Sequence, residues 1–258
     1  MKAKVESSSN YIIKYNTARF SSGLEWFTEF FSINHKRELR VYSWYSKRNC
    51  KNLLIPESYE LTSTHIKIEK LIEIQNSEIL IPDLVPSMNE FILLGVGQKR
   101  NVFDFLSSPT QSVLRGLIRN ASFLGPQLIF QALKHLVLLY WNSPRVARTY
   151  LIHKDLKINQ NMIATSNGVY FIDFGSSILT KHYFLIDIVE LSTDHLANKV
   201  DFDLLRLLIK ELGFENYTIE YLRSQIYLLL LRRTMHFGKV DRANEQIMIN
   251  VKEFLNDL

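Results

Sequence analysis

Two short polar segments constrain this chain of 258 residues more than any other feature of its sequence. The first is HKDLKINQN at residues 153–161, and the second is IDFG at residues 172–175. Between them, short apolar runs flank a Ser-Asn-Gly sequence at residues 166–168, which predicts a strand hairpin with a tight turn. The sequence therefore predicts a loop that carries Asp155, a hairpin, and a second loop that carries Asp173.

This layout suits the transfer of a phosphoryl group from a nucleotide. One carboxylate accepts the proton of the attacking hydroxyl, and a second, together with an amide side chain, holds Mg²⁺ on the phosphates. The order of the two segments resembles the protein-kinase-like superfamily, whose pattern is H-R-D-L-x-x-x-N followed by D-F-G. The resemblance implies that Asp155 is the catalytic base, that Asp173 is a Mg²⁺ ligand, and that His153 packs the catalytic loop as structural support.

The amide of this pattern has two candidates. Counting along the family pattern without a gap reaches Gln160. Asn161 comes one residue later and precedes Met-Ile, which is similar to the Asn-Ile-Leu of the family. Both side chains offer a carbonyl oxygen to a metal ion. The sequence leaves the choice open and favours Asn161 narrowly.

The resemblance also implies a lysine that holds the nucleotide phosphates. Lys14 lies in the middle of YIIKY, the apolar run Tyr11–Tyr15, which predicts a strand. It resembles the lysine of the family's Val-Ala-Ile-Lys, and an unpaired charge among these apolar residues would be costly. The alternative interpretation is a lysine that reaches solvent from an edge strand.

A helix glutamate should position this lysine. We choose Glu38 as this partner, and Glu25 and Glu29 are the other candidates. The alternative interpretation of Glu38 is a solvated helix position among basic neighbours. Two later strands resemble those that lead into the family's hinge. The backbone at Glu69 and Leu71 is therefore expected to contact adenine, and the resemblance implies ATP and Mg²⁺ as cofactors.

A glycine-rich phosphate loop is missing before Tyr11. No G-x-G-x-x-G occurs among the ten residues that precede it, and a Ser-Ser-Ser-Asn turn at residues 7–10 is the available substitute. This absence leaves open a second interpretation of the chain, as a pseudokinase that serves as a binding or scaffold module.

The segment after IDFG bears on the acceptor. Eleven residues separate Gly175 from Asp187, which resembles the Asp that begins a buried helix and braces the catalytic loop, and no Ala-Pro-Glu follows. A long activation segment normally holds peptide substrates, so a Ser/Thr protein kinase is only the third interpretation. The compact form resembles aminoglycoside phosphotransferases and lipopolysaccharide-core sugar kinases, which implies a sugar-containing, glycolipid or other small acceptor.

Composition favours a folded, cytoplasmic protein. Apolar residues make up 47% of the chain and charged residues 22%, as in globular domains. No apolar run is long enough to span a bilayer, no signal peptide is visible, and the single cysteine, Cys50, suits a reducing compartment. The net charge of +5 is mild. It does not predict nucleic-acid binding, but it suits a peripheral contact with an anionic membrane surface.

The pattern of elements predicts an α+β, two-lobed protein-kinase-like fold. A reduced N-terminal lobe would span residues 1–76, and a mostly helical C-terminal catalytic lobe would span residues 77–258. Residues 79–94 carry Pro82 and Pro86 among apolar residues, which favours a linker. Apolar residues three and four positions apart predict helices, and short apolar or alternating runs predict strands. The predicted helices are 23–47, 128–141, 201–212, 219–233 and 244–255, and the predicted strands are 11–15, 57–61, 65–71, 150–152 and 169–172.

Overall fold

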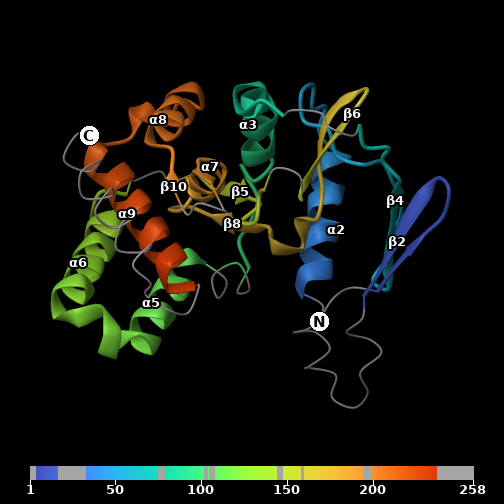
Figure 1. Cartoon of the computed structure of the whole chain (residues 1–258). Coiled ribbons are helices and arrows are strands. Elements are labelled where there is room, and N and C mark those ends of the chain that lie inside the picture. Colours follow the sequence, from blue (N-terminus) through green and yellow to red (C-terminus); the bar gives the residue numbers. More distant parts are fainter. Residues whose placement is uncertain are drawn as a thin grey trace, which may run out of the picture. The chain divides into compact units, whose positions relative to one another are not determined.

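The computed structural model describes residues 4–16, 33–74, 79–101, 104, 108–143, 148–157, 160–194 and 199–236 (Figure 1). The chain forms two compact units, and each is built from two stretches of sequence. Unit 1 comprises Met1–Gly95 with Leu151–Ile178, and unit 2 comprises Val96–Tyr150 with Leu179–Leu258. The helix predicted at 244–255, and residues 23–32 of the helix predicted at 23–47, lie outside the described residues. The lobe boundary at residue 76 stays a prediction.

A four-stranded antiparallel sheet begins unit 1. Its strands are β1 (Lys4–Ser7), β2 (Tyr11–Tyr15), β3 (Ser58–Leu61) and β4 (His65–Glu69), in the order β1-β2-β4-β3. The alternating sequence HIKIE buries Ile66 and Ile68 in the core. β2 is an inner strand, because it pairs with both β1 and β4. The strand predicted at 11–15 is therefore confirmed, and the edge-strand interpretation of Lys14 is wrong.

Helix α2 (Ile33–Tyr45) lies beside this sheet (Figure 1). Its buried residues are three or four positions apart, as one side of a helix requires, and they are Arg37, Glu38, Val41 and Tyr42. The Tyr45 hydroxyl donates to the Leu53 carbonyl oxygen at 3.1 Å and ties the end of the helix to the following loop. The predicted helix is confirmed for residues 33–45.

The linker predicted at 79–94 is wrong. A short 3₁₀ helix, η2 (Ile81–Leu84), is followed by helix α3 (Val85–Leu93), which buries Met88, Phe91 and Ile92. Pro86 lies in the first turn of α3, where a backbone N–H has no partner inside the helix and its loss costs little. The prolines therefore mark the start of a helix.

A hairpin and the IDFG segment complete unit 1. Strand β6 (Met162–Thr165) pairs with β7 (Gly168–Phe171) across the Ser-Asn-Gly turn, as the sequence predicts. The 3₁₀ helix η3 (Phe174–Ser176) follows at once. The chain passes between the two units within the short strands β5 (Tyr150–Ile152) and β8 (Ile178–Thr180).

Unit 2 is mainly helical. Its longer helices are α5 (Pro109–Arg119), α6 (Ala121–Trp141), α8 (Phe202–Glu211) and α9 (Ile219–His236), with the shorter α7 (Ile186–Leu191), η4 (Phe214–Asn216) and the two-residue strands β9 (Thr193–Asp194) and β10 (Lys199–Val200). The helices predicted at 201–212 and 219–233 are confirmed. The helix predicted at 128–141 begins earlier, with a kink at Gly125, whose φ of 66° and ψ of 155° are not helical.

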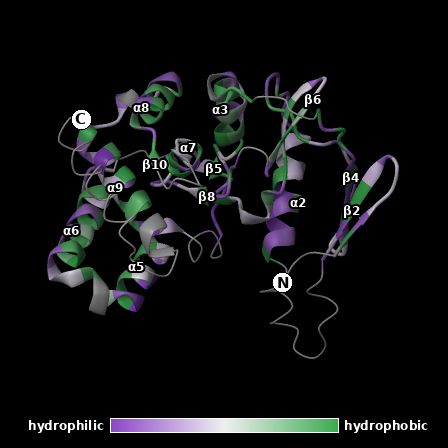
Figure 2. Cartoon of the chain, viewed as in Figure 1, coloured by the Kyte–Doolittle hydropathy of each residue, from purple (hydrophilic) through white to green (hydrophobic). Residues whose placement is uncertain are grey.

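Helices α6 and α9 lie side by side (Figure 1), and hydrophobic residues recur along α6 (Figure 2). Leu228, Leu229, Leu230 and Leu231 of α9 are all buried. Among the described helices, none combines the length and the hydrophobicity that crossing a bilayer requires.

Candidate active site

Three charged side chains from separate parts of the sequence meet in unit 1. Lys14 Nζ on β2 lies 2.7 Å from Glu38 Oε1 on α2 and 3.7 Å from Asp173 Oδ1 of the IDFG segment. The Glu38 side chain is 7% exposed and that of Asp173 is 62% exposed. The structure thus brings together the lysine, the glutamate and one of the two aspartates that the sequence singles out. Glu25 and Glu29, the competitors of Glu38, lie outside the described residues.

The two carboxylates keep the lysine charged. Burial by itself would lower the pKa of Lys14, but the nearby charges of Glu38 and Asp173, and their hydrogen bonds to the ammonium group, raise this pKa above its ordinary value. A fixed cation with one buried and one exposed anionic partner is suited to contact a further anionic group from the solvent side.

Close packing holds α2 against the IDFG segment. A Cβ at Gly175 would come within 3.3 Å of Asn34 Cβ, so the glycine allows the first turn of α2 to approach. One turn after Glu38, the ring of Tyr42 meets Phe174 edge-on, with centroids 5.7 Å apart. Burial, and then the charges of Glu38 and Asp173, raise the pKa of Tyr42, so its hydroxyl stays neutral. These contacts fix Glu38 relative to Asp173.

His153 is a packing residue of the loop that carries Asp155. It is fully buried, and its Nε2–H donates to the carbonyl oxygen of Ile172 at 2.8 Å. Its ring lies 5.5 Å from that of Phe174 and 6.0 Å from that of Phe91, which α3 supplies. Burial lowers the pKa of His153, so the neutral imidazole is favoured. A neutral, enclosed ring of this kind can orient the loop and is unsuited to exchange protons with a substrate.

Asp155 has a cationic neighbour that the sequence reasoning missed. Lys157 Nζ lies 2.8 Å from Asp155 Oδ1, and both side chains are partly exposed. Leu156, between them, is 1% exposed, so the loop turns its apolar residue inward and its two charges outward. The alternation of charged, apolar and charged residues in Asp-Leu-Lys was the available signal for this pair.

The structure separates the two amide candidates. Asn161 is buried, and its side-chain N–H donates to the backbone carbonyl oxygen of Asp155. The backbone carbonyl oxygen of Asn161 accepts from the Ile172 N–H at 3.0 Å. Gln160 is exposed. Asn161 is thus hydrogen-bonded to both aspartate segments. These contacts favour Asn161 over Gln160 as the amide that belongs with the two aspartates.

The donor set around these loops fits Mg²⁺. Asp173 supplies carboxylate oxygens, and the Asn161 amide, whose N–H₂ group is already used, retains a carbonyl oxygen. Asp173 itself has a left-handed backbone, with φ and ψ both 60°, and its side chain is largely exposed. Within the described part of the chain, no cluster of three or more His, Cys, Asp or Glu residues could hold a metal. The carboxylate of Asp173 and the amide oxygen of Asn161 are hard oxygen donors, unlike the Cys and His ligands that zinc favours.

Other predicted residues are not brought to the Lys14 cluster. Glu69 ends β4, where its carboxylate accepts from the Glu57 N–H at 3.3 Å, and Leu71 lies two residues beyond the strand. Asp187 is buried in the first turn of α7, in unit 2. The adenine contacts of Glu69 and Leu71, and the bracing role of Asp187, stay predictions.

The turn between β1 and β2 is closed by its own hydrogen bonds. The N–H groups of Asn10 and Tyr11 donate to Ser8 Oγ at 3.3 and 3.1 Å, and the Ser8 N–H donates to the Tyr11 carbonyl oxygen at 2.9 Å. These N–H groups are already used within the turn. The N–H groups of Ser8, Asn10 and Tyr11 are therefore not open to a phosphate, and a phosphate-binding role for the Ser-Ser-Ser-Asn turn stays a prediction.

No known protein family and no curated protein matches this sequence. Solved structures, however, share its architecture. A candidate fructosamine-3-kinase from Thermobifida fusca is 14% identical, with a TM-score of 0.60, over 100% of this chain and 94% of its own. The fold is protein-kinase-like. A choline/ethanolamine kinase family protein from Mesorhizobium loti is 14% identical, with a TM-score of 0.55, over 99% of this chain and 85% of its own.

A spectinomycin phosphotransferase, in complex with ADP and spectinomycin, shares the same protein-kinase-like fold. It is 13% identical, with a TM-score of 0.51, over 100% of this chain and 85% of its own. These likenesses confirm the expected α+β, protein-kinase-like fold.

Proposed function

We propose that this protein is an ATP-dependent phosphotransferase that acts on a hydroxyl group of a small, non-protein acceptor. The observation that carries the proposal is the cluster of Lys14, Glu38 and Asp173, joined through Ile172 and Asn161 to the loop of Asp155. The proposal includes an N-terminal lobe at residues 1–76 and a C-terminal catalytic lobe at residues 77–258.

Each residue then has a role. Lys14, held by Glu38, contacts the nucleotide phosphates, while Asp173 and Asn161 hold Mg²⁺, which when bound neutralises phosphate charge. Asp155 orients the acceptor hydroxyl and takes its proton. The hydroxyl oxygen bonds to the γ-phosphorus, the bond from that phosphorus to the β,γ-bridging oxygen breaks, and ADP leaves with the electron pair. Lys157, beside Asp155, keeps this carboxylate in place.

The acceptor that best suits this site is a small molecule that carries a sugar. The similar structures include proteins named for spectinomycin, choline or ethanolamine, and fructosamine, all small molecules. The short segment between Gly175 and Asp187 also favours a small acceptor over a peptide. We favour a sugar-containing or glycolipid acceptor, a cytoplasmic location, and a peripheral contact with an anionic membrane.

A pseudokinase is the second candidate, and a specific observation favours it. The β1–β2 turn has no glycine, and its described N–H bonds are made within the turn. If no other backbone covers the phosphates, nucleotide binding is weak and the fold serves as a binding module.

Thermal unfolding with ATP, in Mg²⁺ and in EDTA, separates the two candidates. A ligand at 100 times its Kd adds about 2.7 kcal/mol, which raises Tm by several degrees in a protein of this size. We expect that shift for the wild type in Mg²⁺, and its loss in D173N. D155N should keep the shift but lose phosphoryl transfer to an anionic sugar by at least about a hundredfold. No shift at millimolar ATP would favour the pseudokinase, and full activity of D155N would refute its role as base.

A further inference from the structure

The outward face of α6 carries large apolar side chains that contact solvent. Their exposed fractions are 67% for Phe130, 45% for Leu133, 63% for Val137, 49% for Tyr140 and 83% for Trp141. Three- and four-residue steps place them on one side of the helix. They form a continuous stripe, which we call the α6 stripe, along the helix that follows the kink at residue 125.

The opposite face of α6 is already occupied. Ala132, Leu136 and Leu139 are buried, and His135 Nδ1 lies 3.2 Å from the Ser224 hydroxyl of α9. The His135 ring also stacks on Tyr227, with centroids 4.2 Å apart. These contacts fix the rotation of α6, so the α6 stripe cannot turn into the core. A helix that is apolar on both faces normally has both faces covered, and an exposed stripe of this size marks an interaction surface.

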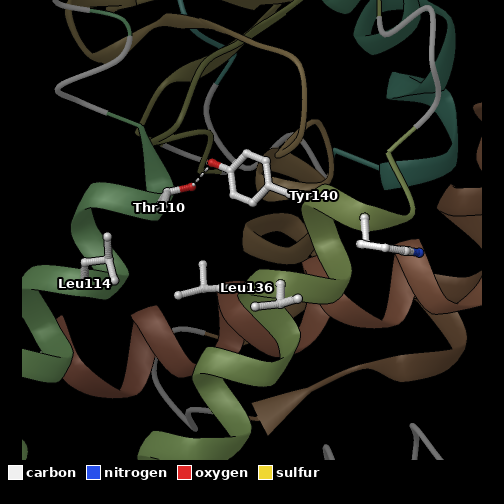
Figure 3. A pocket seen from close by; sticks show the side chains of 6 residues that line it. Thr110, Leu114, Leu136 and Tyr140 are labelled. Carbon is white, nitrogen blue, oxygen red and sulfur yellow. Dashed lines mark hydrogen bonds between the residues drawn. The ribbon is translucent and has the colours of Figure 1, made fainter.

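A groove between α5 and α6 opens beside this stripe (Figure 3). Its volume is about 510 Å³, and it is lined by Thr110, Leu114, Leu136, Val137, Tyr140 and Trp141. The Thr110 and Tyr140 hydroxyls point toward one another at 3.0 Å (Figure 3), and Thr110 also donates to the Tyr183 hydroxyl at 2.9 Å. Because its polar groups bond to one another, the groove offers an apolar lining to whatever enters it.

The charged side chains of α5 and α6 all have one sign. Residues 105–154 contain no Asp or Glu, although the whole chain has 26. Lys134 is exposed within the stripe, because it lies four residues after Phe130 and three before Val137. On α5, Arg115 and Arg119 are exposed near Ile118, which is 78% exposed. The residues that α5 and α6 give to this face therefore combine apolar and aromatic side chains with cations, and none of them is an anion.

We propose that this face of α5 and α6 docks on a bilayer that contains anionic phospholipids. Trp and Tyr side chains favour the boundary between water and hydrocarbon, and cations beside them are attracted to anionic headgroups. An amphipathic surface of this kind lies in the plane of the bilayer and does not cross it. The inference names the residues of a membrane contact and does not depend on the phosphotransferase chemistry, because they all belong to unit 2.

Sedimentation of the full chain with vesicles tests this proposal. We expect binding to phosphatidylcholine mixed with phosphatidylglycerol, weaker binding to phosphatidylcholine alone, and a loss of the difference in high salt. F130S combined with W141S should weaken vesicle binding by about tenfold or more. The matched control, L207S combined with I219S, changes two exposed apolar residues elsewhere in unit 2 and should bind like the wild type.

A charge reversal tests the electrostatic part separately. K134E should remove most of the preference for anionic vesicles, whereas K210E, which changes the net charge equally on exposed α8, should not. Equal losses in both variants, or no vesicle binding by the wild type, would overturn the proposal.

Two further measurements keep the proposal testable if a variant folds poorly. Brominated lipid should quench the tryptophan fluorescence of the wild type but much less that of W141F, which keeps an apolar ring. Sedimentation velocity without lipid should give the same mass for the wild type and F130S/W141S. A dimer that only the wild type forms would overturn the membrane assignment and identify a second copy as the occupant.

Discussion

At the scale of single residues, the ammonium group of Lys14 depends on its two carboxylate neighbours. Glu38, the buried one, lies nearer, and Asp173 reaches it from a largely exposed position. Removing the charge of Glu38 would leave a desolvated cation with only the longer contact.

E38Q tests this dependence because it keeps the shape of the side chain. We expect a loss of about 1–3 kcal/mol in the free energy of unfolding and a Kd for Mg-ATP raised by about tenfold. Chemical denaturation and calorimetric titration measure these two quantities. E220Q, an exposed change in the first turn of α9, is the control and should alter neither. An unchanged Kd in E38Q would contradict the assigned role of Lys14 and Glu38.

The sequence was enough to predict some of the residues of the candidate site but not others. Lys14 and Glu38 could be predicted because a family pattern fixes which residue types the chemistry needs. Lys157 was missed, since a lysine two positions from a carboxylate is ordinary on a polar loop. The choice between Gln160 and Asn161 required the hydrogen bonds of Asn161 to the Asp155 and Ile172 backbone, which no spacing rule contains.

At the scale of elements, Glu90 joins α3 to the loop after α2. Its carboxylate accepts hydrogen bonds from the N–H groups of Lys51, Asn52 and Leu53 at 3.1, 2.9 and 2.8 Å. Burial opposes ionisation, but these bonds outweigh it and lower the pKa of Glu90 below its ordinary value. The next residue, Leu54, bridges to Tyr170 of β7, so Glu90 supports the strand that leads into IDFG.

E90Q should therefore lower the free energy of unfolding by about 1–2 kcal/mol at neutral pH, a modest value because the carboxylate is partly exposed. Since the folded pKa is lowered, the contribution of Glu90 is present above its unfolded pKa and is lost as the pH falls through the folded pKa. Wild type and variant should converge at low pH in urea unfolding. A difference that does not depend on pH would contradict the charged role of Glu90.

Helices and strands could be predicted where hydrophobic residues recur regularly, and the prediction was wrong where prolines were taken to exclude a helix. The alternating HIKIE and the apolar YIIKY could be assigned as strands from sequence. Helix α3 was missed because Pro82 and Pro86 were interpreted as breaks, although a proline in the first turn is compatible with a helix. Helix α6 likewise begins before the predicted range 128–141, because it continues across the kink at Gly125.

At the scale of the whole molecule, two half-buried histidines make stability sensitive to acid. Burial, and then the charge of Lys134, lowers the pKa of His135 to about 4. Burial, and then Arg100 and Lys181, lowers the pKa of His182 to about 4. Because the folded values lie below the ordinary 6.5, the unfolded chain takes up protons first as the pH falls.

Stability should thus be full above pH 6.5 and should decline toward pH 4. Each histidine contributes a slope of at most about 1.4 kcal/mol per pH unit, reduced by its partial exposure to solvent. H135Q should flatten the dependence of the unfolding free energy on pH. At pH 8, the difference in unfolding free energy between H135Q and the wild type measures the part of the effect that does not depend on protonation. The same slope in H135Q and wild type would contradict this account.

The division of the chain also governs how the protein can be made on a ribosome. Unit 1 needs residues 151–178 as well as the first 95, and unit 2 needs residues on both sides of that second stretch. Synthesis proceeds from the N-terminus, so Lys14 and Glu38 emerge long before Asp173 joins them. Neither unit can close its core while only the first 150 residues have been translated. The nascent chain therefore leaves the first sheet without its partners until residues 151–178 emerge, and it exposes the α9-facing side of α6 until residues 219–236 follow.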